Sequence, residues 1–410
     1  MRHTLLLCTL LLGLSCPLPA QDFGPRNEGA AGVMAPYVFP ELRDTPPPSG
    51  YKPFYISHYG RHGSRYHIAS VLKRNLPAEM ERAREKGGLT AQGEKLLDEM
   101  LEVVRAHDGK DGDLSQLGAL QHRLLAERMY KRYPAVFRRG GRDVSCRSSL
   151  LPRCIISMSS FGTSLQQQDK RLNISYSTGQ KDFHLLCHPY EDVKSNRRFL
   201  DSLDAARRPC EFDTAPLVKR LFKPGYEPAD PQAVAKSIYH LGSIEAGIGM
   251  EPVILDAFTP EELSTQWRLY NEWIFGDMGN SSELGARILP AENDLLNDFI
   301  LLADKAVSGE GHAADLRFGH DSGLLPLAGR MGLEGFCTPI PVAGASAEWL
   351  SQERIPTAAN LQMVLYRKKG APVLVKFLYN EIETLIPALE PVKGPYYRWE
   401  DVKQYWKSND

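Results

Sequence analysis

The sequence lacks an excess of charge of either sign and any apolar run of membrane-spanning length. Its 410 residues carry 49 Lys and Arg against 50 Asp and Glu, so overall charge does not favour nucleic acid or an acidic membrane. Affinity for a polyanion must therefore come from local clusters of cations. The hydrophobic fraction of 42% is enough for a large core, which excludes general disorder and favours one large domain with a substantial insertion.

The longest apolar run near the amino terminus, residues 5–14, is too short to cross a bilayer. A basic residue precedes the run and the small residue Ala20 follows it, as in a secretory signal peptide. We therefore expect residues 1–20 to be removed on export to the periplasm or the medium. A second interpretation makes Cys16 a lipoprotein anchor, although Gly13 stands where such a signal normally has leucine.

Cysteine is scarce and irregularly spaced. Removal of the signal would leave five cysteines, an odd number that allows at most two disulfides with one thiol left over, and their connectivity stays open. None has a Cys-x-x-Cys partner or a histidine at zinc-finger spacing, so we expect no structural metal and no cofactor. The five are Cys146, Cys154, Cys187, Cys210 and Cys337.

The first part of the chain alternates strand and helix patterns. A buried strand is predicted over residues 52–57 and a second short strand over 144–147. Helical periodicity occupies the segments between and after them, with Pro134 ending one helix. These helices are predicted over 78–86, 91–105, 117–133 and 154–167. Strands separated by helices favour an α/β sandwich over an all-α bundle.

The middle of the chain is dominated by long amphipathic segments with little strand signal. Helices are predicted there over 191–203, 233–241, 260–274 and 294–307. Strands resume at 315–318 and in a hairpin of 361–366 and 373–379. We therefore predict a three-layer α/β sandwich around a mostly parallel sheet, formed by residues 21–185 and 308–410, with a mainly helical insertion, or cap, over 186–307.

The chemically most informative segment is Arg61-His62-Gly63-Ser64-Arg65, at the end of the first predicted strand. Two guanidiniums can grip a tetrahedral oxyanion from several directions, and a neutral imidazole between them can attack its phosphorus. The spacing therefore indicates an enzyme that passes through a phosphohistidine. The alternative is an exposed basic turn whose histidine titrates in solvent.

This segment resembles the signature of the histidine phosphatase superfamily, in particular its acid phosphatase and phytase branch. The following Tyr66-His67 most resembles the multiple inositol polyphosphate phosphatases. The resemblance implies that His62 is the nucleophile and that Arg61 and Arg65 bind the phosphoryl group. The stretch 112–118 also resembles a segment of this branch, which we interpret as a loop and helix packing behind the site.

A second chemical element, His320-Asp321, follows the predicted strand 315–318 and precedes a helix. By resemblance to the same branch, His320 binds phosphate and Asp321 is the proton donor. An alkoxide is a poor leaving group, so a carboxylic acid must protonate it as the ester bond breaks. Asp321 is alternatively the N-cap of the following helix. The inositol polyphosphate phosphatases typically have His-Ala-Glu at this point, so the two motifs resemble different subfamilies.

A third arginine is expected to complete the anion site. The stretch 148–157 resembles the family segment that carries it, which selects Arg153, with Arg147 as the second choice. With three guanidiniums and a histidine, no metal is needed to supply positive charge.

Clustered cations in the predicted insertion raise the question of the substrate. Together with Tyr66 and His67, the cations Lys194, Arg197 and Arg198 are candidates for binding further phosphates, and two more clusters follow. The alternative is that all of them are solvated helix faces. The further clusters are Arg207 with Arg208, and Lys219 with Arg220 and Lys223.

We therefore expect an exported phosphomonoester hydrolase that acts on a small phosphorylated molecule, with inositol polyphosphates such as phytate as candidates. No nucleic acid partner and no membrane span are expected. The alternatives are a broad-specificity acid phosphatase acting on sugar or nucleotide monophosphates, a mutase of the same superfamily, and a non-catalytic exported protein that binds phosphorylated ligands. The oligomeric state is left open.

Overall fold

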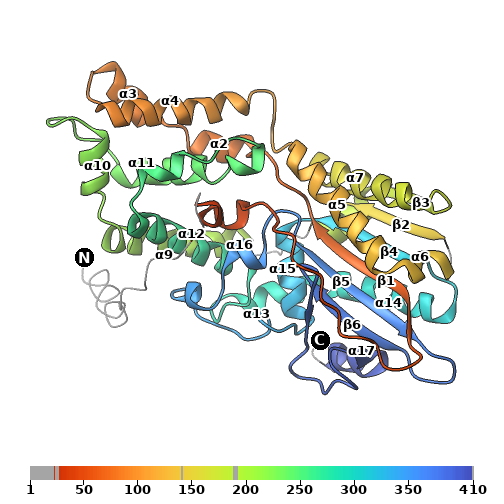
Figure 1. The fold of residues 1–410 in the computed structure, drawn as a ribbon. Helices are drawn as coiled ribbons and strands as arrows, with labels where there is room; N and C mark the ends of the chain where they lie inside the picture. Colours follow the sequence, from red (N-terminus) through yellow and green to blue (C-terminus); the bar gives the residue numbers. More distant parts are fainter. Residues whose placement is uncertain (1–22, 24–26, 140–141, 188–192, 409–410) are drawn as a thin grey trace.

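One mixed β-sheet runs through the computed structural model, which describes residues 23, 27–139, 142–187 and 193–408 (Figure 1). Its strand order is β3-β2-β4-β1-β5-β6-β7, with β8 also paired to β6. The strands are β1 (Lys52–Arg61), β2 (Asp143–Ser148), β3 (Asn173–Thr178), β4 (Ala314–Gly319), β5 (Asn360–Arg367), β6 (Leu374–Tyr379), β7 (Ile382–Thr384) and β8 (Tyr397–Arg398). The predicted α/β class is confirmed.

The sheet is parallel from β3 to β1 and antiparallel from β1 onward. Strands β1 and β4 are parallel neighbours in a register that pairs Arg61 with Gly319, so both strands end at the same edge of the sheet. The residues that follow them, His62 and His320, are thereby brought to the same place.

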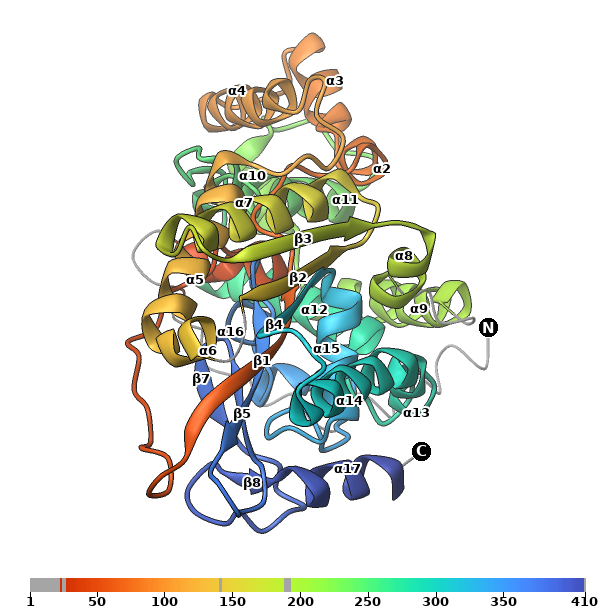
Figure 2. The same ribbon diagram turned by 90° about the vertical axis from the view of Figure 1, so that its right-hand side faces the viewer.

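Helices cover both faces of the sheet because side chains alternate along each strand (Figure 2). On β1, Ile56 faces a core shared with helices α5 (Gln116–Arg132), α6 (Pro134–Arg139) and α7 (Pro152–Gln168). Its neighbours Tyr55 and Tyr59 face the opposite core. That second face is covered by α8 (Gln180–Leu186), α14 (Asn293–Ser308), α15 (Asp321–Arg330) and α17 (Trp399–Ser408). The three-layer arrangement is therefore as predicted.

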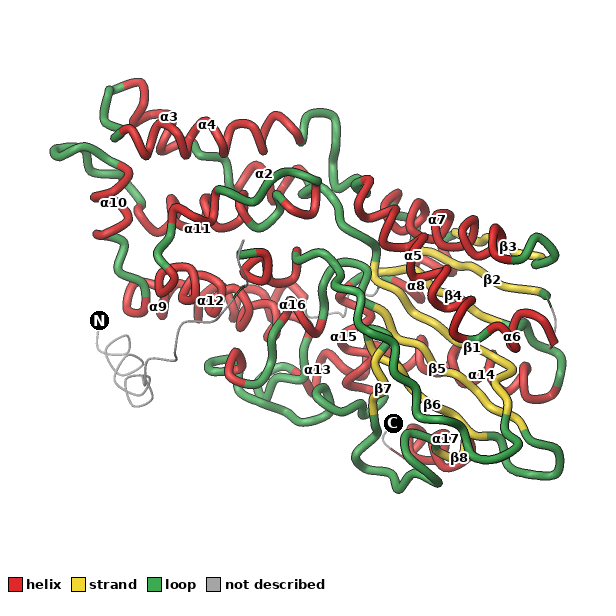
Figure 3. Tube along the Cα trace, in the orientation of Figure 1, coloured by secondary structure: helices red, strands yellow, loops and turns green. Residues whose placement is uncertain are grey.

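A second, helical part lies beyond the edge of the sheet where β1 and β4 end, at the left of Figure 3. Helix α4, from the early part of the chain, packs there against α10 and α11, while α14 lies against β1 of the sheet. The domain boundaries stay a prediction. Outside the sheet layers the helices are α2 (Ala69–Arg74), α3 (Ala78–Glu85), α4 (Ala91–Ala106), α9 (Val193–Glu211), α10 (Ala215–Leu221), α11 (Pro231–Gly242), α12 (Pro260–Met278), α13 (Gly285–Ile288) and α16 (Ser351–Arg354).

The five cysteines outside the predicted signal are free thiols, with Cys146 and Cys154 buried. The predicted signal peptide and Cys16 lie outside the described residues. None of the described helices is long and apolar enough to cross a membrane.

Candidate active site

The two predicted motifs meet at the sheet edge. The ring centroids of His62 and His320 are 5.6 Å apart, although 258 positions separate them in the sequence. Both rings are almost completely buried. Arg61, Arg65, Arg153 and Asp321 act electrostatically on one or both imidazoles. We call these six residues the cationic cluster.

Glycines at 63 and 118 let the motif pass directly over the start of helix α5. A Cβ at Gly63 would lie 2.4 Å from the carbonyl oxygen of Gly118, closer than any side chain tolerates. The backbone N–H of Ser64 then donates to Gln121 on the same helix at 2.9 Å. This confirms the prediction that the 112–118 stretch and the helix after it pack behind the site.

The main chain around His62 is also held from the other side of the sheet edge. The backbone N–H of Ala358 donates to the His62 carbonyl at 2.9 Å, and that of Arg61 donates to Ala359 at 2.8 Å. Ala358 has a φ of 63°, a left-handed conformation that costs a non-glycine residue free energy. The surrounding fold stabilises this conformation, and the nucleophile candidate is correspondingly well fixed.

His62 has the tautomer that a nucleophile requires. Its Nδ1 lies 2.9 Å from the carbonyl oxygen of Gly63, which only accepts, so Nδ1 carries the proton and Nε2 keeps its lone pair. Burial, followed by the neighbouring Arg61 and Arg153, holds the pKa of His62 well below its usual value. The imidazole therefore remains neutral in mildly acidic solution.

Arg61 is fully buried and rigidly held. One terminal nitrogen donates to the carbonyl oxygens of Val33 and Ile355, both at 2.6 Å, and the other lies 2.8 Å from a carboxylate oxygen of Asp321. Its Nε has no hydrogen-bond partner among the residues that the structure describes. The guanidinium is thus fixed in position with one N–H group unused.

Arg65 and Arg153 have no ion pair with any carboxylate of the described residues. Arg65 donates to the carbonyl oxygen of Tyr66 at 2.8 Å, and burial together with the positive charges of Arg153 and Arg61 lowers its pKa to about 10. The Nε of both Arg65 and Arg153 is buried without a partner. Arg147, the second choice for the third arginine, instead pairs with Asp298 at the sheet.

His320 is held by side chains from β1, from α7 and from the segment that follows β2. Its Nε2 forms a hydrogen bond with the hydroxyl of Ser149 at 3.0 Å and lies 3.6 Å from the thiol of Cys154. Its backbone N–H donates to the Tyr59 hydroxyl at 3.0 Å. Burial first, and Arg153 second, lower the pKa of His320 to about 3. The ring is a neutral hydrogen-bonding group beside the guanidiniums.

Asp321 is the first residue of α15, and His320 is the N-cap, so the N-cap interpretation of Asp321 is wrong by one residue. One carboxylate oxygen accepts from the backbone N–H of Ser322 at 3.0 Å, and the other pairs with Arg61. Burial raises the pKa of Asp321, but Arg61, His320 and Arg65 outweigh it and lower the pKa below its usual value. Asp321 is therefore ionised when no anion occupies the cluster.

The charges of the cationic cluster do not balance. Three guanidiniums face one carboxylate, and both imidazoles are neutral. Buried positive charge without a partner is costly, and an anion with several oxygens relieves that cost. The arrangement is therefore suited to binding a tetrahedral oxyanion next to the neutral imidazole of His62.

Tyr66 and His67 contact neighbouring loops and helices. The Lys110 ammonium donates to the Tyr66 hydroxyl at 2.9 Å and lies 4.2 Å from its ring centre. His67 Nε2 donates to the carbonyl oxygen of His240 at 3.0 Å, and its ring stacks on His107. His67 thus ties the motif to α11 of the helical part.

Four of the eight clustered cations of the insertion are ion-paired within the helical part. Lys194, Arg197 and Arg198 are exposed on α9, and Arg197 pairs with Asp277 at 2.8 Å. Arg198 donates to the carbonyl oxygen of Lys194, and no hydrogen bond or ion pair joins either residue to the cationic cluster within the described residues. The other arginines pair similarly: Arg207 with Glu211 and Glu272, Arg208 with Asp204, and Arg220 with Glu262.

The sequence patterns did not identify the residues that hold the cationic cluster in place, such as Ser149, Tyr59 and Ala358. Each acts through a contact between segments far apart in the chain, which no local motif reports. Within the described ranges, no three His, Cys, Asp or Glu side chains are grouped so as to hold a metal ion.

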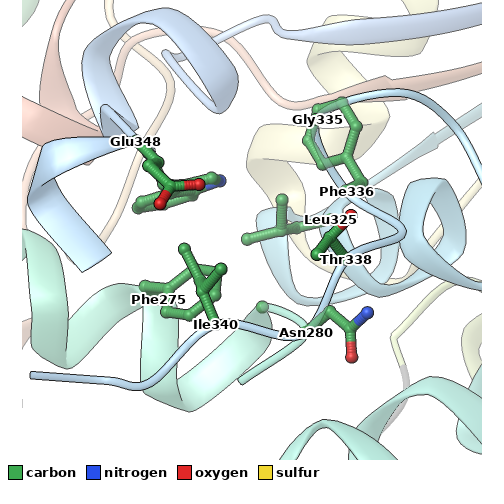
Figure 4. A pocket seen from close by; sticks show the side chains of 10 residues that line it. Phe275, Asn280, Leu325, Gly335, Phe336, Thr338, Ile340 and Glu348 are labelled. Atoms are coloured by element: carbon green, nitrogen blue, oxygen red, sulfur yellow. The ribbon is translucent and has the colours of Figure 1, made fainter. Parts of the chain in front are cut away.

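A separate cavity of about 140 Å³ lies beside α15 and contains none of the cluster residues (Figure 4). Apolar side chains such as Phe275, Leu325 and Phe336 surround much of it. Its remaining lining residues are Gly279, Asn280, Gly335, Thr338, Ile340, Glu348 and Trp349. It has no phosphate-binding cations and is not the proposed reaction site.

Solved structures of phosphatases are similar to the chain. The multiple inositol polyphosphate phosphatase of Bifidobacterium longum in complex with phosphate matches with a TM-score of 0.78 and 20% identity, covering 93% of this chain and 98% of that one. The same enzyme in complex with inositol hexasulfate has a TM-score of 0.77, also at 20% identity, with 92% and 97% covered. The phytase from D. castellii has a TM-score of 0.73 at 16% identity, with 97% and 88% covered.

The chain has the fold of these phosphatases. No family model and no curated protein sequence matches it. The similarity to these enzymes therefore rests on the three-dimensional fold. It agrees with the family resemblance of the sequence motifs.

Proposed function

We propose that the chain is a phosphomonoester hydrolase that works through a phosphohistidine on His62. The observation that carries the proposal is the combination of surplus positive charge with a buried, neutral imidazole whose Nε2 is free. A binding site alone needs the charge but has no use for the free nucleophile. The fold shared with inositol polyphosphate phosphatases and phytases supports the same reaction class.

In the first half-reaction, His62 Nε2 attacks phosphorus while the bond from phosphorus to the ester oxygen breaks. Arg61, Arg65, Arg153 and His320 bind the non-bridging oxygens, and Asp321 protonates the departing oxygen. Because Asp321 is ionised in the empty cluster, its proton must come with the substrate. A phosphate monoester is a monoanion below its second pKa of about 6, and that proton can pass to Asp321 on binding.

In the second half-reaction, water attacks the phosphorus of phosphohistidine and the bond to Nε2 breaks. The Asp321 carboxylate accepts the proton that the water gives up, and inorganic phosphate is formed. His62 returns to the neutral tautomer because Nδ1 remains bonded to the Gly63 carbonyl throughout.

Inositol polyphosphates such as phytate are the substrates that we propose first. The multiple inositol polyphosphate phosphatase with this fold binds inositol hexasulfate, and Tyr66-His67 resembles that group. The Asp321-Ser322 pair and the ion-paired arginines of the insertion favour the alternative, a broad-specificity acid phosphatase acting on sugar or nucleotide monophosphates. Export to the periplasm or the medium is proposed from the signal-like residues 1–20, with a lipid anchor at Cys16 as the second choice.

The test is release of inorganic phosphate from inositol hexakisphosphate, glucose 6-phosphate and AMP. We expect turnover of all substrates that bind to fall by at least about 1,000-fold in His62→Ala, with the thermal midpoint nearly unchanged. His184→Ala, a matched change of an exposed histidine on α8, should keep full activity. Comparable rates on all three substrates would favour the broad acid phosphatase. Binding of inositol hexakisphosphate without any phosphate release would instead support the alternative of a non-catalytic protein that binds phosphorylated ligands.

A further inference from the structure

Helix α12 (Pro260–Met278) of the helical part brings a tyrosine toward the cationic cluster. The helix is well anchored at its start, where Thr259 and Glu262 form a capping box. It packs against α15, whose first residue is Asp321, and against the 3₁₀ helix η1 (Glu28–Met34), whose Val33 carbonyl accepts from Arg61. Tyr270 lies about midway along α12 and is only partly buried.

The ring of Tyr270 is held between the two segments that also hold the Arg61–His67 stretch. It makes edge contacts with Tyr239 and His240, at centroid distances of 5.6 and 5.0 Å. A Cβ at Gly32 would lie 3.8 Å from the same ring. The carbonyl of His240 accepts from His67, and Gly32 directly precedes Val33. The ring is thus fixed relative to the motif.

The hydroxyl of Tyr270 is unused within the protein. The adjacent Tyr239 hydroxyl donates to the carbonyl oxygen of Ala30 at 2.7 Å, whereas the Tyr270 hydroxyl has no hydrogen bond to any described residue. It is also absent from the buried polar atoms that lack a partner, so solvent reaches it. A tyrosine hydroxyl that solvent reaches and that no described residue uses is available to a ligand.

Charged residues of the cationic cluster act on this hydroxyl. Burial raises the pKa of Tyr270 to about 12, and Asp321 raises it further, while Arg65 and Arg61 lower it. The hydroxyl therefore keeps its proton and can donate a hydrogen bond.

We propose that Tyr270 binds the alcohol part of the substrate and selects for leaving groups that carry an oxygen acceptor next to the scissile ester. This inference rests on the proposed function, in which Asp321 protonates the ester oxygen. Tyr270 lies on the helix that packs against α15, at the start of which Asp321 stands, and its ring is next to the segment that holds Arg61. A donor at this end of the cluster faces the alcohol that Asp321 protonates. The matching chemical class is a polyol phosphate with a neighbouring hydroxyl or phosphate, of which an inositol polyphosphate is one example.

The test is Tyr270→Phe, which removes the hydroxyl and keeps the ring. We expect kcat/KM for inositol hexakisphosphate to fall about 10- to 100-fold, the loss typical of one hydrogen bond to a charged group. Activity on p-nitrophenyl phosphate, whose leaving group has no neighbouring acceptor, should stay within about two-fold. Inhibition by inositol hexasulfate should weaken about as much as kcat/KM, whereas inhibition by inorganic phosphate should not change.

Tyr239→Phe is the matched control, because it removes a hydroxyl from the adjacent ring that donates to the main chain. It should leave the ratio of the two substrates unchanged. Equal kinetics of Tyr270→Phe and the unmodified protein on both substrates would overturn the inference. An equal loss on both substrates, with weaker inhibition by phosphate, would place the hydroxyl on the phosphoryl group and also overturn it. If the unmodified protein releases phosphate from neither substrate, the proposed function itself fails.

Discussion

His62 illustrates how neighbouring groups prepare a residue for chemistry. An ordinary histidine is protonated near pH 5 and cannot attack phosphorus. Here burial and the surrounding guanidiniums keep the ring neutral, and the Gly63 carbonyl holds the proton on Nδ1. In the proposed mechanism, the cations that bind the phosphoryl group therefore also keep the nucleophile reactive in acid.

Asp321→Asn tests the proposed acid. An amide cannot protonate an alkoxide, so turnover of alkyl phosphates such as glycerol 2-phosphate should fall about 100- to 1,000-fold. The loss on p-nitrophenyl phosphate should be less than about 10-fold, because p-nitrophenolate leaves without a proton. Asp294→Asn, at an exposed position of α14, should change neither rate. Equal losses on the two substrates would exclude Asp321 as the proton donor.

The ionised state of Asp321 predicts the pH dependence of catalysis. Because Arg61 keeps the pKa of Asp321 low, the reacting proton enters with the monoanionic ester, whose second pKa is about 6. We expect kcat/KM for alkyl phosphates to be highest below neutrality and to fall about tenfold per pH unit above pH 6. A rate profile that peaks well above pH 7 would contradict this proton source.

At the scale of elements, the site depends on two parallel strands that end in register and on a motif that crosses α5 at close range. Gly63→Ala tests the second point, because the added Cβ would lie 2.4 Å from the Gly118 carbonyl. We expect the free energy of unfolding to fall by about 1–3 kcal/mol and phosphatase activity to fall more than 10-fold as His62 moves. Both are measurable by denaturant titration and phosphate release.

Gly179→Ala is the control for this substitution. No atom lies within 4 Å of a Cβ placed there, and the backbone is extended. Stability and activity should both remain near those of the unmodified chain. If Gly63→Ala were equally harmless, the close approach of motif and helix would not determine the position of the nucleophile.

Elements with a strong hydrophobic pattern were predictable from the sequence. Helix α4 was expected over 91–105 and occupies Ala91–Ala106, and the hairpin of β5 and β6 is present as predicted. Strand β3 (Asn173–Thr178) was not predicted, because it is an edge strand with mostly exposed side chains and lacks apolar alternation. Strand β1 extends to Arg61, beyond its predicted end, since parallel pairing with β4 continues along a polar stretch.

At the scale of the whole molecule, the sequence predicts those residues of the candidate site that directly follow the ends of strands. His62 and His320 meet because β1 and β4 are parallel neighbours, and the third arginine by the cluster is Arg153 as expected. The partners of the insertion cations and the approach of Tyr270 were not predictable, since both depend on how separate helices pack. Ion pairs such as Arg197 with Asp277 have no local sequence pattern.

The many buried neutral histidines predict that the folded chain loses stability in acid. The unfolded chain binds protons on histidine below about pH 6.5, whereas the folded chain does not until much lower pH. Each such group contributes stability above pH 6.5 that falls by up to about 1.4 kcal/mol per pH unit below it. These histidines are His58, His67, His122 and His320, with pKa values of about 3, His240, at about 4, and His62 and His107, whose pKa values burial also lowers.

Buried carboxyl groups with raised pKa act in the opposite direction but are fewer. Burial raises the pKa of Glu245 to about 8 and raises those of Glu272, Glu292 and Glu381. We therefore expect the thermal midpoint to fall steadily from pH 6.5 to 4.5, by calorimetry or circular dichroism. His67→Gln removes one of these imidazoles, so the number of protons taken up on unfolding in this pH range should fall by about one. A midpoint that is constant over this range would show that the imidazoles are not kept neutral.

The most direct measurement is to quench a reaction with ³²P-labelled substrate in the burst phase and to locate the label by mass spectrometry. We predict acid-labile, base-stable phosphorus on the imidazole of His62, bonded through Nε2, and none in His62→Ala. Label on any other residue, or phosphate release without a labelled protein at any quench time, would contradict a mechanism through His62.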